Sequence, residues 1–208
     1  MKIIDIICSA GKTGFYFDDQ RAIKAGAGHD GFDYVGEPVT EGFKRIRQAG
    51  ESISVMFILE DGQVAHGDCA AVQYSGAGGR DPLFLASDFI PVIKNEIAPK
   101  LIGRDINEFR PLAEEVDTME LNGKRLHTAI RYGLTQAILD AAAKTNKVTM
   151  AEIIKKEYAT DVAIKRLPLF TQSGDDRKDN ADKMIIKGAD IMPHALINHV
   201  ETKLGLDG

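Results

Sequence analysis

The stretch S-I-S-V-M-F-I-L-E-D-G-Q-V-A-H-G-D-C-A, residues 52–70, decides the fold of the first part of this chain. Residues 52–60 give the strongest strand signal in the sequence, because they are rich in β-branched and apolar side chains. Asp61-Gly62 is a favoured two-residue hairpin turn, and residues 63–70 then return beside the first strand. With a further strand expected at residues 2–8, the sequence predicts an antiparallel meander.

A long Gly- and Asp-rich stretch, from Gly11 to Gly36, separates the first strand from this hairpin. A connection of that length inside a compact domain is usually functional rather than an idle linker. We therefore expect it to be a functional segment or a lid.

From Asp81 onward the apolar residues follow helical spacing. We expect helices over 82–99, beginning at Pro82, over 107–119, and over 150–158, where Thr149 and Glu152 form a capping box. Another helix carries its apolar face at Leu126, Ile130, Leu134, Ala137, Ile138 and Ala141. Residues 1–160 therefore predict an α+β domain, in which the meander is followed by a helical layer.

The pattern changes after residue 160 to alternating strands and helices, which is typical of a parallel α/β unit. A parallel sheet must be covered on both faces, and a complete eight-stranded barrel needs about 250 residues. Residues 161–208 therefore predict only the start of a barrel, completed by another chain or segment. The expected elements are a strand at 164–170, a helix at 177–188, a short strand at 190–194 and a helix carrying Leu196, Val200 and Leu204.

The composition of the chain excludes several classes of protein. The chain is 44% hydrophobic and 27% charged with a formal net charge of −5, which argues against a nucleic-acid or anionic-membrane surface. Apolar runs are too short for a membrane span, and the N-terminal stretch is a poor signal peptide. Two cysteines are too few for a disulfide framework. We expect a cytoplasmic protein with reduced thiols.

The acidic stretch Asp175-Asp176-x-x-Asp179 matches a D-D-x-x-D pattern that binds Mg²⁺ and diphosphate in prenyl-diphosphate enzymes. Those enzymes place it on a long helix of an all-α fold, whereas here it opens a short helix, so helix capping is the favoured interpretation. Ser173-Gly174 lacks the surroundings of a nucleophile elbow, and we interpret it as a plain turn.

The Gly-rich segment at residues 74–82 ends at an expected helix start, but its spacing is neither that of a P-loop nor that of a dinucleotide site. We interpret the segment as a loop that covers a site rather than as a phosphate-binding nest. Gln172 and His194 follow adjacent expected strands at their carboxyl ends, where parallel α/β folds bind ligands. That shared position suggests a common site, although a lone histidine is more often structural.

Together these segments resemble the methylaspartate ammonia-lyase family of the enolase superfamily, over essentially all 208 residues. The resemblance covers about the first half of the family's usual chain. The segments that carry it are T-G-F-Y-F-D-D-Q-R-A-I-K (13–24), G-A-G-H-D-G-F (26–32), G-E-S-I-S-V (50–55), residues 61–82, L-H-T-A-I-R-Y-G-L-T-Q-A-I-L-D-A (126–141), Q-S-G-D-D-R (172–177) and P-H-A-L-I-N (193–198).

The resemblance implies an enolase-like capping domain followed by a (β/α) barrel, and the reversible loss of ammonia from 3-methylaspartate to give mesaconate. His194 matches the family histidine on one face of the substrate, as base toward one diastereomer or electrostatic partner for the other. Gln172 matches a substrate-binding amide, Phe170 the pocket wall, and Gln73 a loop residue that reaches the substrate amino side. These assignments rest on the resemblance.

The resemblance also implies Mg²⁺, whose charge stabilises the developing enolate, and a monovalent cation such as K⁺ is a further candidate. The family's three carboxylate ligands and its lysine base lie on later barrel strands. We therefore expect no metal ligands in this chain, a second chain or segment carrying the rest of the barrel, and a dimer of such assemblies. The open alternatives are a non-catalytic cap or binding subunit, or a superfamily enzyme with another carboxylate substrate, such as a cycloisomerase or dehydratase. A Mg²⁺-diphosphate enzyme is less favoured.

Overall fold

The computed structural model of the chain describes residues 1–71, 81–172, 177–192 and 201, and it divides into two units, Met1–Val162 and Ala163–Gly208. In the first unit β4 (Arg47–Leu59) pairs antiparallel with β5 (Val64–Ala70), which confirms the predicted hairpin. The connection is longer than two residues, because Leu59 N donates to Gln63 O at 2.9 Å. Gly62, with φ of +84°, takes the left-handed conformation that such a longer loop requires.

The first strand is much longer than the predicted residues 2–8. β1 (Ile3–Asp18) pairs antiparallel with β4 up to its last residue, with an irregularity between Lys12 and Tyr16, and the strand order is β1-β4-β5. Its second half contains Gly11 and Gly14, which gives it a weak strand signal on its own. Pairing with the first residues of β4 holds this half extended, so a partner far away in sequence overrides the local signal.

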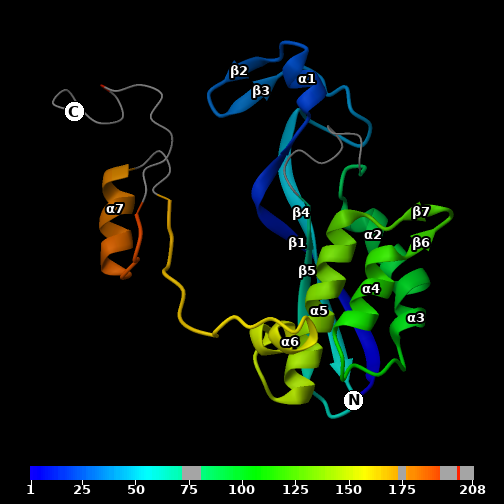
Figure 1. Cartoon of the computed structure of the whole chain (residues 1–208). Helices are drawn as coiled ribbons and strands as arrows, with labels where there is room; N and C mark the ends of the chain where they lie inside the picture. The colour runs from blue at the N-terminus through cyan, green and yellow to red at the C-terminus, as the bar shows by residue number, and fades with distance from the viewer. Residues whose placement is uncertain (72–80, 173–176, 193–200, 202–208) are drawn as a thin grey trace. The chain divides into compact units, whose positions relative to one another are not determined.

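Between β1 and β4 the chain makes a detour that we call the excursion, residues 19–46. It contains α1 (Gln20–Lys24) and a small hairpin of β2 (Gly28–Asp30) and β3 (Asp33–Val35). Figure 1 shows it projecting beyond one end of the three-stranded sheet. Much of the predicted Gly- and Asp-rich connection is therefore an ordered, separate element.

The helix expected at 82–99 begins later and is interrupted. The chain stays extended up to Leu85, and the elements that follow lack a regular α-helical ladder because Pro91 and Pro99 have no N–H group.

The described elements from here to residue 157 are α2 (Ala86–Val92), the π-helical turn η1 (Ile93–Ile97), α3 (Ala98–Leu101), α4 (Arg110–Thr118), the small strands β6 (Glu120–Leu121) and β7 (Lys124–Arg125), α5 (Thr128–Asn146) and α6 (Met150–Glu157).

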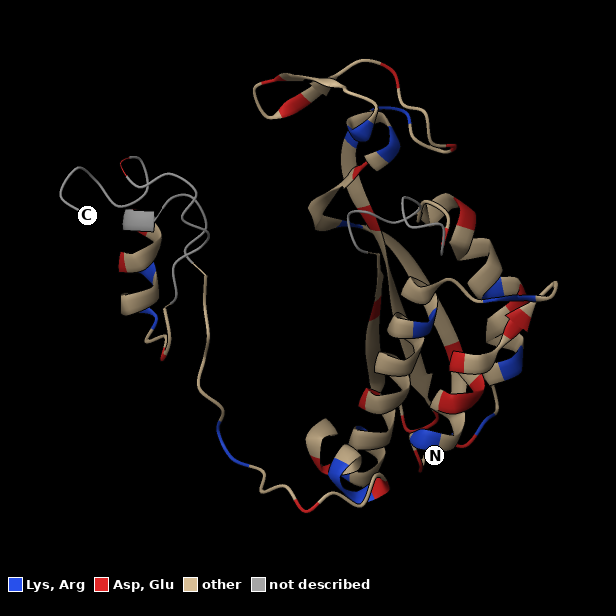
Figure 2. Ribbon diagram, turned by 45° about the horizontal axis from the view of Figure 1, so that its top comes forward, with Lys and Arg blue, Asp and Glu red and all other residues tan. Residues whose placement is uncertain are grey.

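The predicted capping box of α6 is confirmed, because the Thr149 hydroxyl accepts from Glu152 N while the Glu152 carboxylate accepts from Thr149 N. The apolar face predicted for α5 is confirmed as well, since all six residues named for it are buried. Figure 2 shows basic and acidic residues interspersed along these helices.

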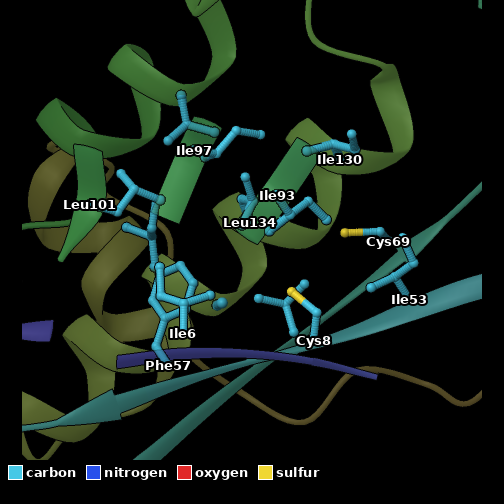
Figure 3. Packing of buried hydrophobic residues seen from close by; sticks show 14 of the residues in the cluster. Ile6, Cys8, Ile53, Phe57, Cys69, Ile93, Ile97, Leu101, Ile130 and Leu134 are labelled. Atoms are coloured by element: carbon cyan, nitrogen blue, oxygen red, sulfur yellow. The ribbon is translucent and has the colours of Figure 1, made fainter. Parts of the chain in front are cut away.

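The hydrophobic core lies between the helices and one face of the sheet (Figures 1 and 3). Alternate residues of β4 are completely buried, and each such side chain contributes about 1.5–3 kcal/mol relative to an exposed one. Their partners come from η1, α3 and α5. The labelled core residues in Figure 3 are Ile6, Cys8, Ile53, Phe57, Cys69, Ile93, Ile97, Leu101, Ile130 and Leu134.

Helix α5 crosses β5 at two glycines. A Cβ atom built on Gly67 would lie 2.0 Å from Gly133 O and 2.8 Å from Ala137 N. A Cβ atom on Gly133 would lie 2.5 Å from the Cys69 sulfur and 2.6 Å from Cys69 N. Helix and strand therefore touch backbone to backbone, which only glycine allows at either position.

Helix α5 also covers the outer edge of β5, the last strand of the sheet. An exposed strand edge presents unpaired N–H and C=O groups that attract further strands. Side chains from successive turns of α5 bind these groups instead. The three bonds run from His66 N to Asp140 Oδ2 (2.8 Å), from Asp68 N to Gln136 Oε1 (3.3 Å) and from Lys144 Nζ to Val64 O (2.7 Å).

The second unit contains α7 (Arg177–Ile186) and a parallel bridge between Phe170 and Ile191. The bridge confirms the parallel pairing, but the strand predicted at 164–170 is reduced to this one bridged residue. A short strand is held extended by its neighbours, and here it has one described partner. The helix expected around Leu196 lies outside the described residues. No helix in the part of the chain that the structure describes has the length and apolar character needed to cross a membrane.

Candidate active site

Phe170 and Gln172 lie at the end of the extended segment that opens the second unit. Thr171, between them, donates its N–H to Ile191 O at 3.0 Å, and its hydroxyl contacts the sulfur of Met184 on α7. Side chains of an extended segment alternate in direction, so Phe170 and Gln172 are expected to point to the side opposite α7. Both side chains are exposed, Phe170 to 59%. Their exposure leaves both side chains accessible to a ligand.

Asp190, directly before the bridged residue Ile191, binds this segment through its side chain and its backbone. Its carboxylate accepts from Leu169 N at 2.7 Å and from the Arg166 guanidinium at 2.8 Å. Backbone bonds from Asp190 N and Ile191 N to Leu169 O, both 3.1 Å, complete the link. Hydrogen bonds of the residues before and after Phe170, Leu169 and Thr171, thus fix the backbone that carries its side chain.

The other two predicted site residues, Gln73 and His194, lie outside the described residues. The same holds for Ser173, Asp175 and Asp176, so the acidic motif is described only in part. Its third member, Asp179, lies in the first turn of α7, where a carboxylate interacts favourably with the positive end of the helix dipole.

Within the described residues, no group of three or more His, Cys, Asp or Glu side chains has a geometry that could hold a metal ion. The thiols of Cys8 and Cys69 are buried in the core, and burial raises the pKa of both, that of Cys69 to about 12. They remain protonated at neutral pH and are unsuited as nucleophiles or ligands.

His127 has a structural role that explains its burial. Its Nδ1 accepts from Ala129 N at 3.0 Å and caps α5, so Nε2 carries the proton and donates to Pro82 O at 3.0 Å. Burial lowers the pKa of His127, and the ring packs against Phe84 and Phe89. The neutral ring fixes the chain that leads into α2 against the start of α5.

One group that sequence reasoning missed is Asp19, which anchors the excursion. Its Oδ2 accepts from Val39 N (2.7 Å) and Thr40 N (2.8 Å), while Oδ1 accepts from the Thr40 hydroxyl (2.6 Å). Oδ1 also caps α1 through Arg21 N and Ala22 N. Burial opposes ionisation of Asp19, but these hydrogen bonds outweigh it and lower its pKa. The signal in the sequence was an acidic residue directly before a helix.

Asp19→Asn is expected to destabilise the chain at neutral pH by about 1–3 kcal/mol, because an amide NH₂ would face backbone N–H donors. The lowered pKa means that the charged form stabilises the fold above about pH 4 and that this contribution is lost as the pH falls through the folded-state pKa. Urea unfolding of both proteins at pH 7 and pH 3 measures this. A stability difference that stays constant between the two pH values would contradict it.

Solved structures place the fold in a known class. A dipeptide epimerase from Methylococcus capsulatus, complexed with Mg and a dipeptide, matches 98% of this chain and 48% of its own with a TM-score of 0.60 at 17% identity, which shows the fold alone. The chain therefore shares the fold of the corresponding half of that epimerase. The crystal structure of β-methylaspartase from Clostridium tetanomorphum, an Mg complex, has a TM-score of 0.88 at 74% identity and covers 100% of this chain and 50% of its own.

The family follows from two family models and a further solved structure. Models described as the N-terminus and the C-terminus of methylaspartate ammonia-lyase match residues 1–159 and 161–208. The methylaspartate ammonia lyase of Citrobacter amalonaticus, solved with (2S,3S)-3-methylaspartic acid, has a TM-score of 0.86 at 57% identity, over 100% of this chain and 51% of its own. This chain belongs to the methylaspartate ammonia-lyase family. It spans about half the length of the curated relatives it matches.

Proposed function

We propose that this chain supplies the cap, residues 1–160, and the first part of the barrel, residues 161–208, of a carbon–nitrogen lyase that removes ammonia from 3-methylaspartate to give mesaconate. The observation that carries the proposal is identity of 74% to the Clostridium tetanomorphum enzyme over the whole chain. A match of this extent to one family argues against the two alternatives, a non-catalytic subunit and a superfamily enzyme with another substrate.

The exposed apolar side chains of the second unit support the need for the remaining barrel. Leu167 is 72% exposed and Leu169 56%, in the segment that leads to the parallel bridge at Phe170, and Ile186, at the end of α7, is 83% exposed. Parallel sheets occur almost only with both faces covered. A second chain or segment that adds further strands and helices would bury these residues, and the assemblies are expected to pair as dimers in the cytoplasm.

Within the assembled site, each residue of this chain has a role that matches its chemistry. His194 would exchange the proton next to a carboxylate for one substrate diastereomer and stabilise charge for the other. The Gln172 amide would bind a carboxylate or the ammonium group, and Gln73 would reach the amino side. Phe170, exposed beside Gln172 in this unit, would form apolar wall. Mg²⁺, with K⁺ as a further candidate, would be held by residues outside this chain.

Complementation tests the proposal. The 208-residue chain, co-expressed with the second half of the Clostridium tetanomorphum enzyme, is expected to form a complex that releases ammonia from 3-methylaspartate in the presence of Mg²⁺. Neither half alone is expected to turn over. Gln172→Ala serves as the variant that should lower turnover, and Lys147→Ala, on the exposed end of α5, as its control. A purified complex without lyase activity, or turnover by the 208-residue chain alone, would refute the proposal.

A further inference from the structure

The hairpin of β6 and β7 carries Asn122 and Gly123 at its tip, and Asn122 is the only asparagine of the chain that precedes a glycine. Asn122 has a φ of +54° and Gly123 one of +73°, so both central residues of the turn are left-handed. This is the type I′ form that an Asn-Gly pair favours. Both residues are exposed, and Figure 1 shows the hairpin projecting from the neighbouring helices.

An asparagine that precedes a glycine is able to lose its amide as ammonia without an enzyme. The backbone nitrogen of the glycine gives its proton to solvent base and attacks the side-chain carbon Cγ. The N–Cγ bond forms, and the Cγ–Nδ2 bond breaks as ammonia leaves. Water then opens the resulting succinimide ring at either carbonyl, which yields aspartate or isoaspartate. Glycine favours the attack because it has no Cβ atom beside the reacting nitrogen.

Both reacting groups are accessible in this turn. Within the residues that the structure describes, no hydrogen bond engages the Asn122 side-chain amide or the Gly123 N–H. A Cβ atom built on Gly123 would meet nothing within 4 Å, so the surroundings leave room for ring closure. The hairpin is held by two residue pairs, Glu120 with Arg125 and Leu121 with Lys124. So short a ladder opens readily, which lets the Asn122 backbone rotate as ring closure requires.

The loop between β4 and β5 contains a related pair, Asp61-Gly62, whose groups are engaged. Gly62 N, which corresponds to the attacking nitrogen, donates to Leu59 O at 2.9 Å. The Asp61 carboxylate accepts from Gln63 N at 3.0 Å and from Gln63 Nε2 at 2.6 Å. Gly62 and Gly123 are both exposed and both have a positive φ, so exposure and glycine conformation do not distinguish the two loops. Their hydrogen bonding does.

We propose that Asn122 is a site of spontaneous deamidation, which converts the tip of the β6–β7 hairpin to aspartate or isoaspartate. The reaction needs neither a substrate nor the remaining barrel, so the inference is independent of the proposed function. Either product adds a negative charge beside Lys124. Isoaspartate also adds a methylene group to the backbone, which no longer fits a two-residue turn, so the pairing of Leu121 with Lys124 is lost in that product.

The test incubates the folded 208-residue chain in mildly alkaline buffer. Peptide mass spectrometry follows each asparagine, and an isoaspartyl methyltransferase counts the isoaspartate formed. Asn122 is expected to deamidate at least about tenfold faster than any other asparagine of the described residues. Asn122→Gln, whose longer side chain would have to form a larger ring, should remove this fast reaction. A chain in which Asn122 reacts no faster than the other asparagines overturns the proposal.

Asp61→Asn is the matched control, because it places the same dipeptide in the β4–β5 loop. In the folded variant, position 61 is expected to react at least about tenfold more slowly than Asn122, since hydrogen bonds must break before its ring closes. In urea, where both turns are unfolded, the two positions should react at similar rates. Equal rates in the folded variant would overturn the inference that hydrogen bonding selects Asn122. A difference of the same size in urea would overturn it as well.

Discussion

Gly67→Ala is expected to destabilise the first unit by about 3 kcal/mol or more and to lower its Tm by about 10 °C. The added methyl group would lie 2.0 Å from the backbone oxygen of Gly133. A flexible side chain could move aside, but a helix backbone cannot, so α5 would have to shift away from β5 and lose its core contacts. Thermal unfolding of the 208-residue chain followed by circular dichroism measures the effect.

Gly14→Ala is the matched control. It makes the same substitution in a strand of the same sheet, at a position where no atom lies within 4 Å of the new Cβ. Its Tm should stay close to that of the wild type. A Gly67→Ala protein that unfolds at the same temperature as Gly14→Ala would show that the α5–β5 crossing tolerates extra volume.

His194→Ala in the assembled enzyme is expected to reduce kcat/KM for one diastereomer of 3-methylaspartate by about 100-fold or more, the size of a general acid–base contribution. The other diastereomer should lose much less, because for it the histidine would only stabilise charge. Steady-state kinetics with each pure diastereomer give the two ratios.

His66→Ala provides the control for this substitution. His66 is exposed on β5, and its contribution to the fold is a backbone bond to Asp140 that alanine retains. Both diastereomers should be processed by this variant at the wild-type rate. Equal losses for the two diastereomers in His194→Ala would remove the assignment of that residue to one face of the substrate.

Local signals predicted the elements whose apolar spacing is regular. The core face of α5, the capping box at Thr149 and the β4–β5 hairpin are of this kind, because neighbours in sequence determine them. The second half of β1 and the break at η1 could not be predicted in the same way. Gly11 is extended because it pairs with Ser52, a contact between distant residues, and η1 depends on how two prolines fit one helical path.

The candidate site also combines features that local rules predict with features that they do not. Phe170 and Gln172 share a direction that follows from strand alternation, which is a local rule. The roles of Gln73 and His194 came only from the resemblance to the family, and they stay predictions. Asp19 was missed as an anchor because its partners Val39 and Thr40 lie 20 and 21 residues further along the chain, and they meet it only once the excursion is folded.

The side chains of α5 that occupy the edge of β5 also bear on how this protein is made in the cell. With that edge closed, a newly synthesised cap has less opportunity to recruit strands from other molecules. The apolar residues around Phe170 have no comparable protection in the described part of the second unit. In the assembly that we propose, further barrel strands would cover these apolar residues. Synthesis of its two parts close together in time and space would then favour correct assembly over aggregation.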